Sequence, residues 1–201
     1  MNKQKINGIW PVVPTSFRDD GAVDYAGVRN ILDCMIAQGV DGGCILANYS
    51  EQFLITDEER IQITKMSLEH VKGRMPLIVT VSHFATKIAV ERAKFAKEQG
   101  AVAVMLMPPY HGALLKGSEQ QTFEQVCAVG EVGLPIMVQD APLSGVQLSV
   151  DFLIKMAKEI EMVKMFKIES VNAAEKIGDL ISRGGESIEG PFDGEEGITL
   201  L

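Results

Sequence analysis

The regular alternation of short apolar runs with longer amphipathic stretches is the feature that most constrains how this chain can fold. The apolar runs follow one another about every 30 residues, which is the length of a strand–helix–strand unit. Several runs are apolar throughout, as is typical of strands covered on both faces. The pattern predicts a parallel sheet with strands at 8–13, 43–47, 77–81, 102–107, 134–139 and 163–167, and a weaker seventh at 186–190.

Helices are predicted between these strands. Apolar residues at 28, 31, 32, 35 and 36 form a stripe along one face of a helix. Thr56 can cap a second helix, with Glu59 three residues later reaching back to it. Gly39, Gly73 and Gly100 mark helix ends, where a left-handed backbone favours glycine. Residues 152–160 and 173–182 repeat the helical pattern.

Seven strands and six full helices in strict alternation are compatible with an open doubly wound sheet or with a (β/α)8 TIM barrel. The first strand–helix turn lacks the Gly-x-Gly-x-x-Gly motif of dinucleotide-binding sheets. Polar residues instead follow several separate strands, as they do around the active sites of barrels. We therefore predict a single α/β domain over residues 1–201, an incomplete TIM barrel that lacks its eighth strand–helix unit.

Composition excludes several classes of protein. The net charge of −8, with acidic and basic residues interspersed, disfavours a nucleic-acid partner. No run approaches the roughly 18 apolar residues of a membrane span, and the N-terminus is not a signal peptide. The three cysteines have no metal-type spacing, which predicts no metal site and a cytoplasmic location.

Lys167 is the most informative single residue. Because side chains alternate along a strand, Val163, Met165, Lys167 and Glu169 share one face. If that face is the barrel interior, desolvation lowers the pKa of Lys167 and makes its amine available as a Schiff-base nucleophile. The alternative is a lysine that extends from the strand end into solvent.

Polar groups follow four other predicted strands. A loop with Asn48, Tyr49 and Ser50 offers hydrogen bonds to a carboxylate or hydroxyl, although a helix cap in a polar loop is an equal alternative. Gln139 can hold a water or a substrate hydroxyl. His111 follows two prolines, and a histidine titrates near neutrality, so this residue could move protons. Ser82, after another predicted strand, is a further candidate. For both residues the alternative is a position in an exposed loop without a function.

These places coincide with the motifs of a known family. The chain resembles the dihydrodipicolinate synthase / N-acetylneuraminate lyase family of Schiff-base-forming (β/α)8 enzymes over residues 8–200. The resemblance is strongest in Pro14-Thr15-Ser16-Phe17, in 51–60, in Pro108-Pro109-Tyr110 and in the Lys-x-Glu at Lys167 and Glu169. It implies an imine on Lys167 with no metal or organic cofactor, a small 2-keto acid as substrate, and a homo-oligomer, tetrameric in full-length members.

Departures from the family pattern indicate the reaction. The family's Gly-Thr-Thr-Gly-Glu motif is replaced here by Ala47-Asn48-Tyr49-Ser50-Glu51. Two tyrosines of the family are also replaced, the one after strand five by Gln139 and a second one by His111. The tyrosine proton relay of the family is therefore absent. With a glutamine at the end of this strand, the chain is similar to the subgroup that dehydrates L-2-keto-3-deoxyarabonate to 2,5-dioxopentanoate in pentose catabolism.

The resemblance to this subgroup implies a role for each site residue. Glu169 is expected to act as the base or to activate water, with Ser170 as its helper. Gln139 would orient water or the leaving hydroxyl. Tyr49 and Ser50, beside Asn48, would hold the substrate carboxylate.

Two alternatives stay open. An aldolase or decarboxylating dehydratase of the same family would act on another 2-keto-3-deoxy acid. A non-catalytic binding remnant or inactive fragment would explain a chain that stops within a seventh helix, because an unclosed barrel leaves two unpaired strand edges. On that reading we expect the 201-residue chain to be poorly soluble or inactive unless a partner chain completes it.

Overall fold

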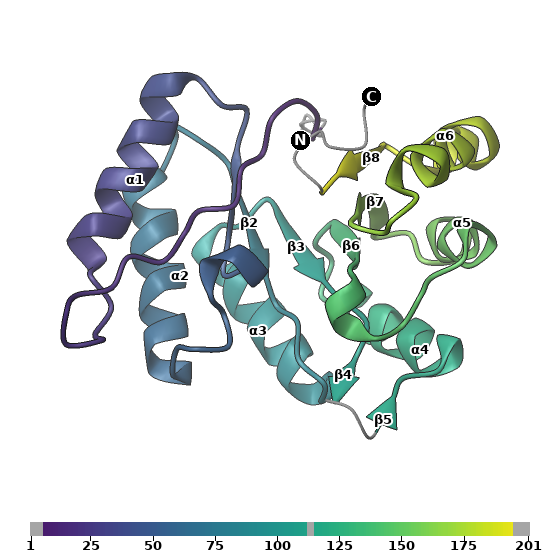
Figure 1. Cartoon of the computed structure of the whole chain (residues 1–201), viewed down its shortest axis with the longest axis horizontal. Coiled ribbons are helices and arrows are strands. Elements are labelled where there is room, and N and C mark those ends of the chain that lie inside the picture. The colour runs from purple at the N-terminus through teal and green to yellow at the C-terminus, as the bar shows by residue number, and fades with distance from the viewer. Residues whose placement is uncertain (1–5, 112–114, 195–201) are drawn as a thin grey trace. The chain divides into compact units, whose positions relative to one another are not determined.

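The structure of the chain is a computed structural model that describes residues 6–111 and 115–194. Within these residues six α-helices alternate with the strands of one six-stranded sheet, as the sequence predicts (Figure 1). The strand order in that sheet is β1-β2-β3-β6-β7-β8, so consecutive sheet strands are neighbours. The elements divide into two compact units, which are described separately below. Whether residues 1–201 form one domain stays a prediction.

One unit comprises residues 7–80 and 94–104. Strand β1 (Gly43–Ile45) pairs in parallel with β2 (Leu77–Thr80), and all of their side chains are buried. Helices α1 (Tyr25–Gln38) and α2 (Asp57–Val71) pack against each other, and a 3-10 turn, η1 (Asn48–Ser50), follows β1. A strand whose side chains are buried on both faces is what the continuously apolar runs predict.

The other unit comprises residues 81–93 and 105–194. Strands β6 (Ile136–Asp140), β7 (Val163–Ile168) and β8 (Gly190–Asp193) pair in parallel. Helices α4 (Glu119–Gly130), α5 (Val150–Glu159) and α6 (Ala173–Gly184) lie along one side of them (Figure 1). The units share α3 (Thr86–Gln99) and β3 (Ala103–Leu106), while β4 (Tyr110–His111) and β5 (Leu115–Lys116) form a small hairpin that the sequence pattern did not predict.

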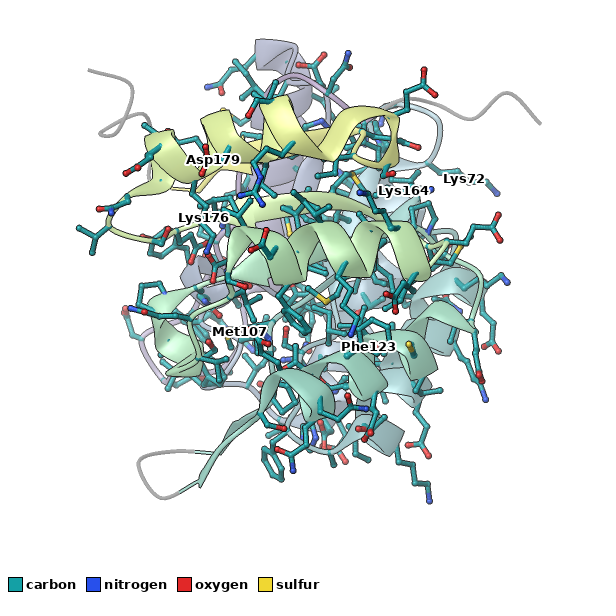
Figure 2. All side chains as sticks on the ribbon, turned by 90° about the vertical axis from the view of Figure 1, so that its right-hand side faces the viewer. Lys72, Met107, Phe123, Lys164, Lys176 and Asp179 are labelled. Atoms are coloured by element: carbon teal, nitrogen blue, oxygen red, sulfur yellow. The ribbon has the colours of Figure 1, made fainter. Side chains whose placement is uncertain are left out.

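The apolar contact between α4 and α5 illustrates the packing of this second unit. Phe123 of α4 meets Phe152 of α5 with ring centroids 6.5 Å apart (Figure 2). The Lys155 ammonium lies 5.1 Å from the Phe123 ring centroid, within the range of a cation–π contact. Between the helices and the strands lies a core of fully buried side chains, including Val138, Leu153 and Phe166.

Two predicted strands differ from the structure, at the two ends of the series. The run at 8–13 forms only an isolated bridge between Val12 and Cys44, since Pro11 and Pro14 have no backbone N–H to donate. The prediction of a strand at 186–190 is wrong in its position. Residues Gly185–Ser187 form a 3-10 turn, and β8 begins at Gly190.

Helix ends follow the predicted signals closely. The Thr56 hydroxyl accepts a hydrogen bond from the Glu59 backbone N–H at 3.2 Å, and the Thr56 N–H donates to Glu59 Oε2 at 2.8 Å. This reciprocal capping box starts α2 where the sequence predicts it. Gly39, with φ of 73°, closes α1 in the left-handed conformation.

We expect Thr56→Ala to lower the free energy of unfolding by about 1 kcal/mol, because the Glu59 N–H at the start of α2 loses its acceptor, the Thr56 hydroxyl. Chemical denaturation followed by circular dichroism measures the change. Thr56→Ser keeps the capping oxygen and is the control. Equal destabilisation by the serine and alanine variants would contradict the assignment of the cap.

Candidate active site

The register between β6 and β7 brings the central residues of the candidate site together. Gln139 is the direct neighbour of Lys167 across the two strands, and Asp140 is the neighbour of Ile168. Because side chains alternate along each strand, Gln139 and Lys167 project to the same face of the sheet. Glu169 follows β7, and its backbone N–H donates to the carbonyl of Asp140 at 3.0 Å. The predicted lysine, carboxylate and amide therefore meet at the carboxyl ends of two adjacent strands.

A single carboxylate oxygen joins the three side chains. Glu169 Oε1 lies 2.7 Å from Lys167 Nζ and accepts a 2.8 Å hydrogen bond from Gln139 Nε2. The Lys167 and Glu169 side chains are 15% and 12% exposed, and Gln139 is fully buried. Charges this deeply buried are stable only as hydrogen-bonded pairs. The Lys167 ammonium thus has a proton acceptor in direct contact, which is what conversion to a nucleophilic amine requires.

Two polar atoms at this site make no hydrogen bond with the described residues. They are Gln139 Oε1 and Ser170 Oγ, and both are shielded from solvent. Because the amide nitrogen of Gln139 is fixed on Glu169, its oxygen is left to accept a hydrogen bond from another donor. Buried polar atoms of this kind are rare and are typical of places where a ligand or water binds.

Gly194, which follows β8, borders the lysine. Its N–H donates to the carbonyl of Ile168 at 2.8 Å. A Cβ at this position would lie 2.4 Å from Glu169 Cγ and 3.1 Å from Lys167 Cε. The residue must therefore be a glycine for the Lys167 and Glu169 side chains to keep their places, a requirement that the sequence pattern did not reveal.

Ser82 lies in the same unit, but its hydroxyl is already engaged. Ser82 is fully buried, and its Oγ accepts a hydrogen bond from the Met107 N–H at 2.9 Å. Its carbonyl accepts from Arg92 at 2.8 Å. These bonds tie the segment that follows β2 to the segment that follows β3 and to α3. The side chain of His111 lies outside the part of the chain that the structure describes, so its predicted role stays a prediction.

The loop with Asn48, Tyr49 and Ser50 belongs to the other unit, where it forms η1. The Ser50 hydroxyl donates to the carbonyl of Val13 at 2.6 Å, and Asn48 Oδ1 accepts from Gln52 at 2.8 Å. Tyr49 is 60% exposed. Leu46, with φ of 60°, and Glu51, with φ of 56°, flank the turn in the left-handed region, which is costly for non-glycine residues and common beside functional sites.

Other chemistries find little support in the described residues. Within 6–111 and 115–194, no group of three or more His, Cys, Asp or Glu side chains could hold a metal ion. The three cysteines are free thiols, and burial raises the pKa of the Cys127 thiol. In the same ranges, no helix is both long enough and apolar enough to cross a membrane.

Comparisons with known proteins place the chain in a family. Residues 5–188 match the family model of the dihydrodipicolinate synthetase family. An L-2-keto-3-deoxyarabonate dehydratase from Azospirillum brasilense is 55% identical over 195 residues, which cover 96% of this chain and 63% of that protein. An uncharacterised DapA-like lyase from Rhizobium meliloti is 30% identical over 158 residues, covering 78% of this chain and 52% of that protein. The chain spans less than two thirds of the length of these relatives.

Solved structures confirm the predicted fold class. Dihydrodipicolinate synthase from Aquifex aeolicus superposes with a TM-score of 0.84 at 26% identity, over 91% of this chain and 61% of that one. A prophage protein of the dihydrodipicolinic acid synthase family from E. coli K12, solved in complex with pyruvate, gives 0.78 at 25% identity, over 86% and 59%. With six helices and six sheet strands described, the chain is an incomplete (β/α)8 barrel.

We expect Gly194→Ala to lower the free energy of unfolding by about 1–3 kcal/mol, because the new methyl group would overlap Glu169 and Lys167. Denaturant titration measures the loss. Gly178→Ala is a matched control within α6, where a Cβ meets nothing within 4 Å. It should instead stabilise by about 0.5–1 kcal/mol through helix propensity. The same sign for both variants would contradict the close approach at Gly194.

Proposed function

The chain belongs to the dihydrodipicolinate synthetase family, and on this premise we propose that it carries the catalytic lysine of a Schiff-base hydro-lyase. The substrate class is 2-keto-3-deoxy sugar acids, and the specific reaction is dehydration of L-2-keto-3-deoxyarabonate to 2,5-dioxopentanoate. The observation that carries the proposal is the buried contact of Lys167 with Glu169, which in turn accepts a hydrogen bond from Gln139. The 55% identity to a dehydratase supports the choice of reaction.

Imine formation is the first step. Lys167 passes a proton to Glu169, 2.7 Å away, and the neutral amine attacks the C2 ketone of the substrate. A carbon–nitrogen bond forms, and the ketone oxygen leaves as water after protonation. The lysine supplies this chemistry by itself, and no metal or organic cofactor enters the step.

Dehydration follows from the iminium, which withdraws electrons from C3. Glu169 is the proposed base, which removes a C3 proton, and the resulting enamine expels the C4 hydroxyl as water. Ser170 is the proposed helper of Glu169. Gln139 neither gives nor takes a proton near neutral pH, so its role is to orient water or the leaving hydroxyl through Oε1. Tautomerisation and hydrolysis of the imine release the dioxo acid.

The remaining proposed contacts come from the family resemblance for residues 48–50, and from positions after two other strands for Ser82 and His111. Asn48, Tyr49 and Ser50 would hold the substrate carboxylate, and Ser82 and His111 would complete the binding of the sugar acid. The partner is a small 2-keto acid and not a nucleic acid. A cytoplasmic location and assembly as a homotetramer in the full-length protein are further proposals of the same kind.

We expect borohydride to trap a covalent adduct of a 2-keto acid such as pyruvate on Lys167, located by peptide mass mapping. Lys167→Ala should abolish the adduct. Lys164→Ala is the matched control, since Lys164 lies on the same strand and, by alternation, on the opposite face (Figure 2). A folded protein whose Lys167 stays unmodified would overturn the proposal.

We expect Glu169→Gln to lower the rate of dehydration by about 10²–10⁴-fold, because the base in contact with Lys167 is lost. Analysis of products from L-2-keto-3-deoxyarabonate measures the rate and also identifies the reaction. Dioxopentanoate indicates the dehydratase, whereas pyruvate with an aldehyde indicates the aldolase alternative. Glu161→Gln, a change at an exposed carboxylate before β7, is the control. Unchanged turnover in Glu169→Gln would exclude this residue as the base.

A further inference from the structure

A second buried ion pair lies behind the candidate site, in the same unit. Lys176, in the first turn of α6, donates to Asp140 Oδ2 at 2.5 Å and also to the carbonyl of Leu148. The two charged side chains are 13% and 4% exposed. Figure 2 shows Lys176 between the ribbons of α6 and α5, whereas Asp179, three residues later, is exposed. Lys176 is thus directed into the protein, unlike a typical lysine on the surface of a helix.

Asp140 connects this ion pair to the candidate site through the backbone. Its carbonyl accepts the N–H of Glu169 at 3.0 Å, and its Oδ1 accepts the N–H of Leu148 at 3.4 Å. It directly follows Gln139, whose side chain holds Glu169 Oε1 on the other face of the strand. The carboxylate of Asp140 is therefore fixed by Leu148 and Lys176, while its carbonyl holds the backbone of Glu169.

The energetics of such a pair favour a positional role. Burying two charges costs several kcal/mol in solvation, and replacing a buried ion pair by apolar side chains is often neutral or stabilising. A pair of this kind gives little net stability. It does define one geometry, because any movement that separates the two side chains leaves two buried charges without partners. This geometry includes the strand end that carries Gln139 and the backbone that carries Glu169.

We infer that Asp140 and Lys176 are positioning residues, which hold Gln139 and Glu169 in the places that the reaction at Lys167 needs. The expected effect on the reaction rate rests on the proposed function. Neither Asp140 nor Lys176 is proposed to contact the substrate. Lys176 acts through Asp140. Asp140 acts through its carbonyl, which accepts the hydrogen bond of the Glu169 N–H, and through its covalent neighbour Gln139. Displacements of about 1 Å at a reacting group can lower a rate by 10²-fold.

The test uses four variants and one matched pair of controls. Lys176→Met and Asp140→Asn each remove one partner, the double variant removes both, and Lys176→Arg keeps the charge. Arg183→Met and Asp151→Asn are the controls, because Arg183 of α6 pairs with Asp151 of α5 at the surface. The controls break an ion pair of the same helix without touching β6.

The first readout is kcat per Lys167 site, with the sites counted by borohydride trapping. We expect Lys176→Met and Asp140→Asn to lower kcat by about 10–100-fold with KM changed much less, and Lys176→Arg to restore most of it. The double variant should regain thermal stability, because no unpaired charge remains, but not kcat. Equal kcat per site in the double variant and the surface controls would overturn the inference.

The second readout needs no substrate. Hydrogen exchange at the Glu169 amide should be faster in Lys176→Met and Asp140→Asn than in the wild-type chain, and unchanged in Arg183→Met. If Lys176→Met does not fold, Asp140→Asn, which keeps size and shape, carries the test. Absence of any wild-type adduct would refute the proposed function alone. Unaltered exchange at Glu169 in a folded Asp140→Asn variant would refute the positioning role alone.

Discussion

The parallel register of β6 against β7 is the constraint on which the candidate site depends. It sets Gln139 beside Lys167 and Asp140 beside Ile168. Since successive side chains point to opposite faces, a shift by one residue would exchange the contents of the two faces. Gln139 would then turn toward the helices, and Asp140 would turn toward the lysine. The pairing of the two strands thus decides which side chain of β6 lies beside Lys167.

Each face of this strand pair buries one lysine ammonium beside one carboxylate. On one face Lys167 is paired with Glu169, and on the other Lys176 is paired with Asp140. Each ammonium is neutralised at hydrogen-bond distance, which is the condition for burying it. The difference lies in the remaining contacts. Lys176 also donates to a carbonyl that fixes it in place, whereas near Lys167 the atoms Gln139 Oε1 and Ser170 Oγ make no hydrogen bond with the described residues.

Local patterns in the sequence predicted the parts of this arrangement that depend on local interactions. Alternation along one strand placed Lys167 and Glu169 on a common face, and the spacing of Thr56 and Glu59 located the start of α2. Pairing between distant segments could not be predicted in this way. The contact of Gln139 with Glu169 spans 30 residues, and that of Lys176 with Asp140 spans 36. In the sequence, Lys176 is indistinguishable from a solvated lysine on an amphipathic helix. The strand at 8–13 was overestimated because its apolar pattern outweighed the two prolines that remove ladder donors.

An amide in place of a tyrosine changes how protons move at this site. A tyrosine hydroxyl can relay a proton, whereas the amide of Gln139 can only donate and accept hydrogen bonds. In the proposed mechanism the proton that Lys167 releases would pass to Glu169, which is in direct contact with it, and the same carboxylate would return a proton to a departing hydroxyl. A dehydration needs this exchange, because one group removes a proton at C3 and a proton leaves with the C4 oxygen. A carbon–carbon cleavage instead requires deprotonation of a substrate hydroxyl, which is the step a tyrosine relay serves. The replacement at residue 139 therefore agrees with the proposed elimination of water.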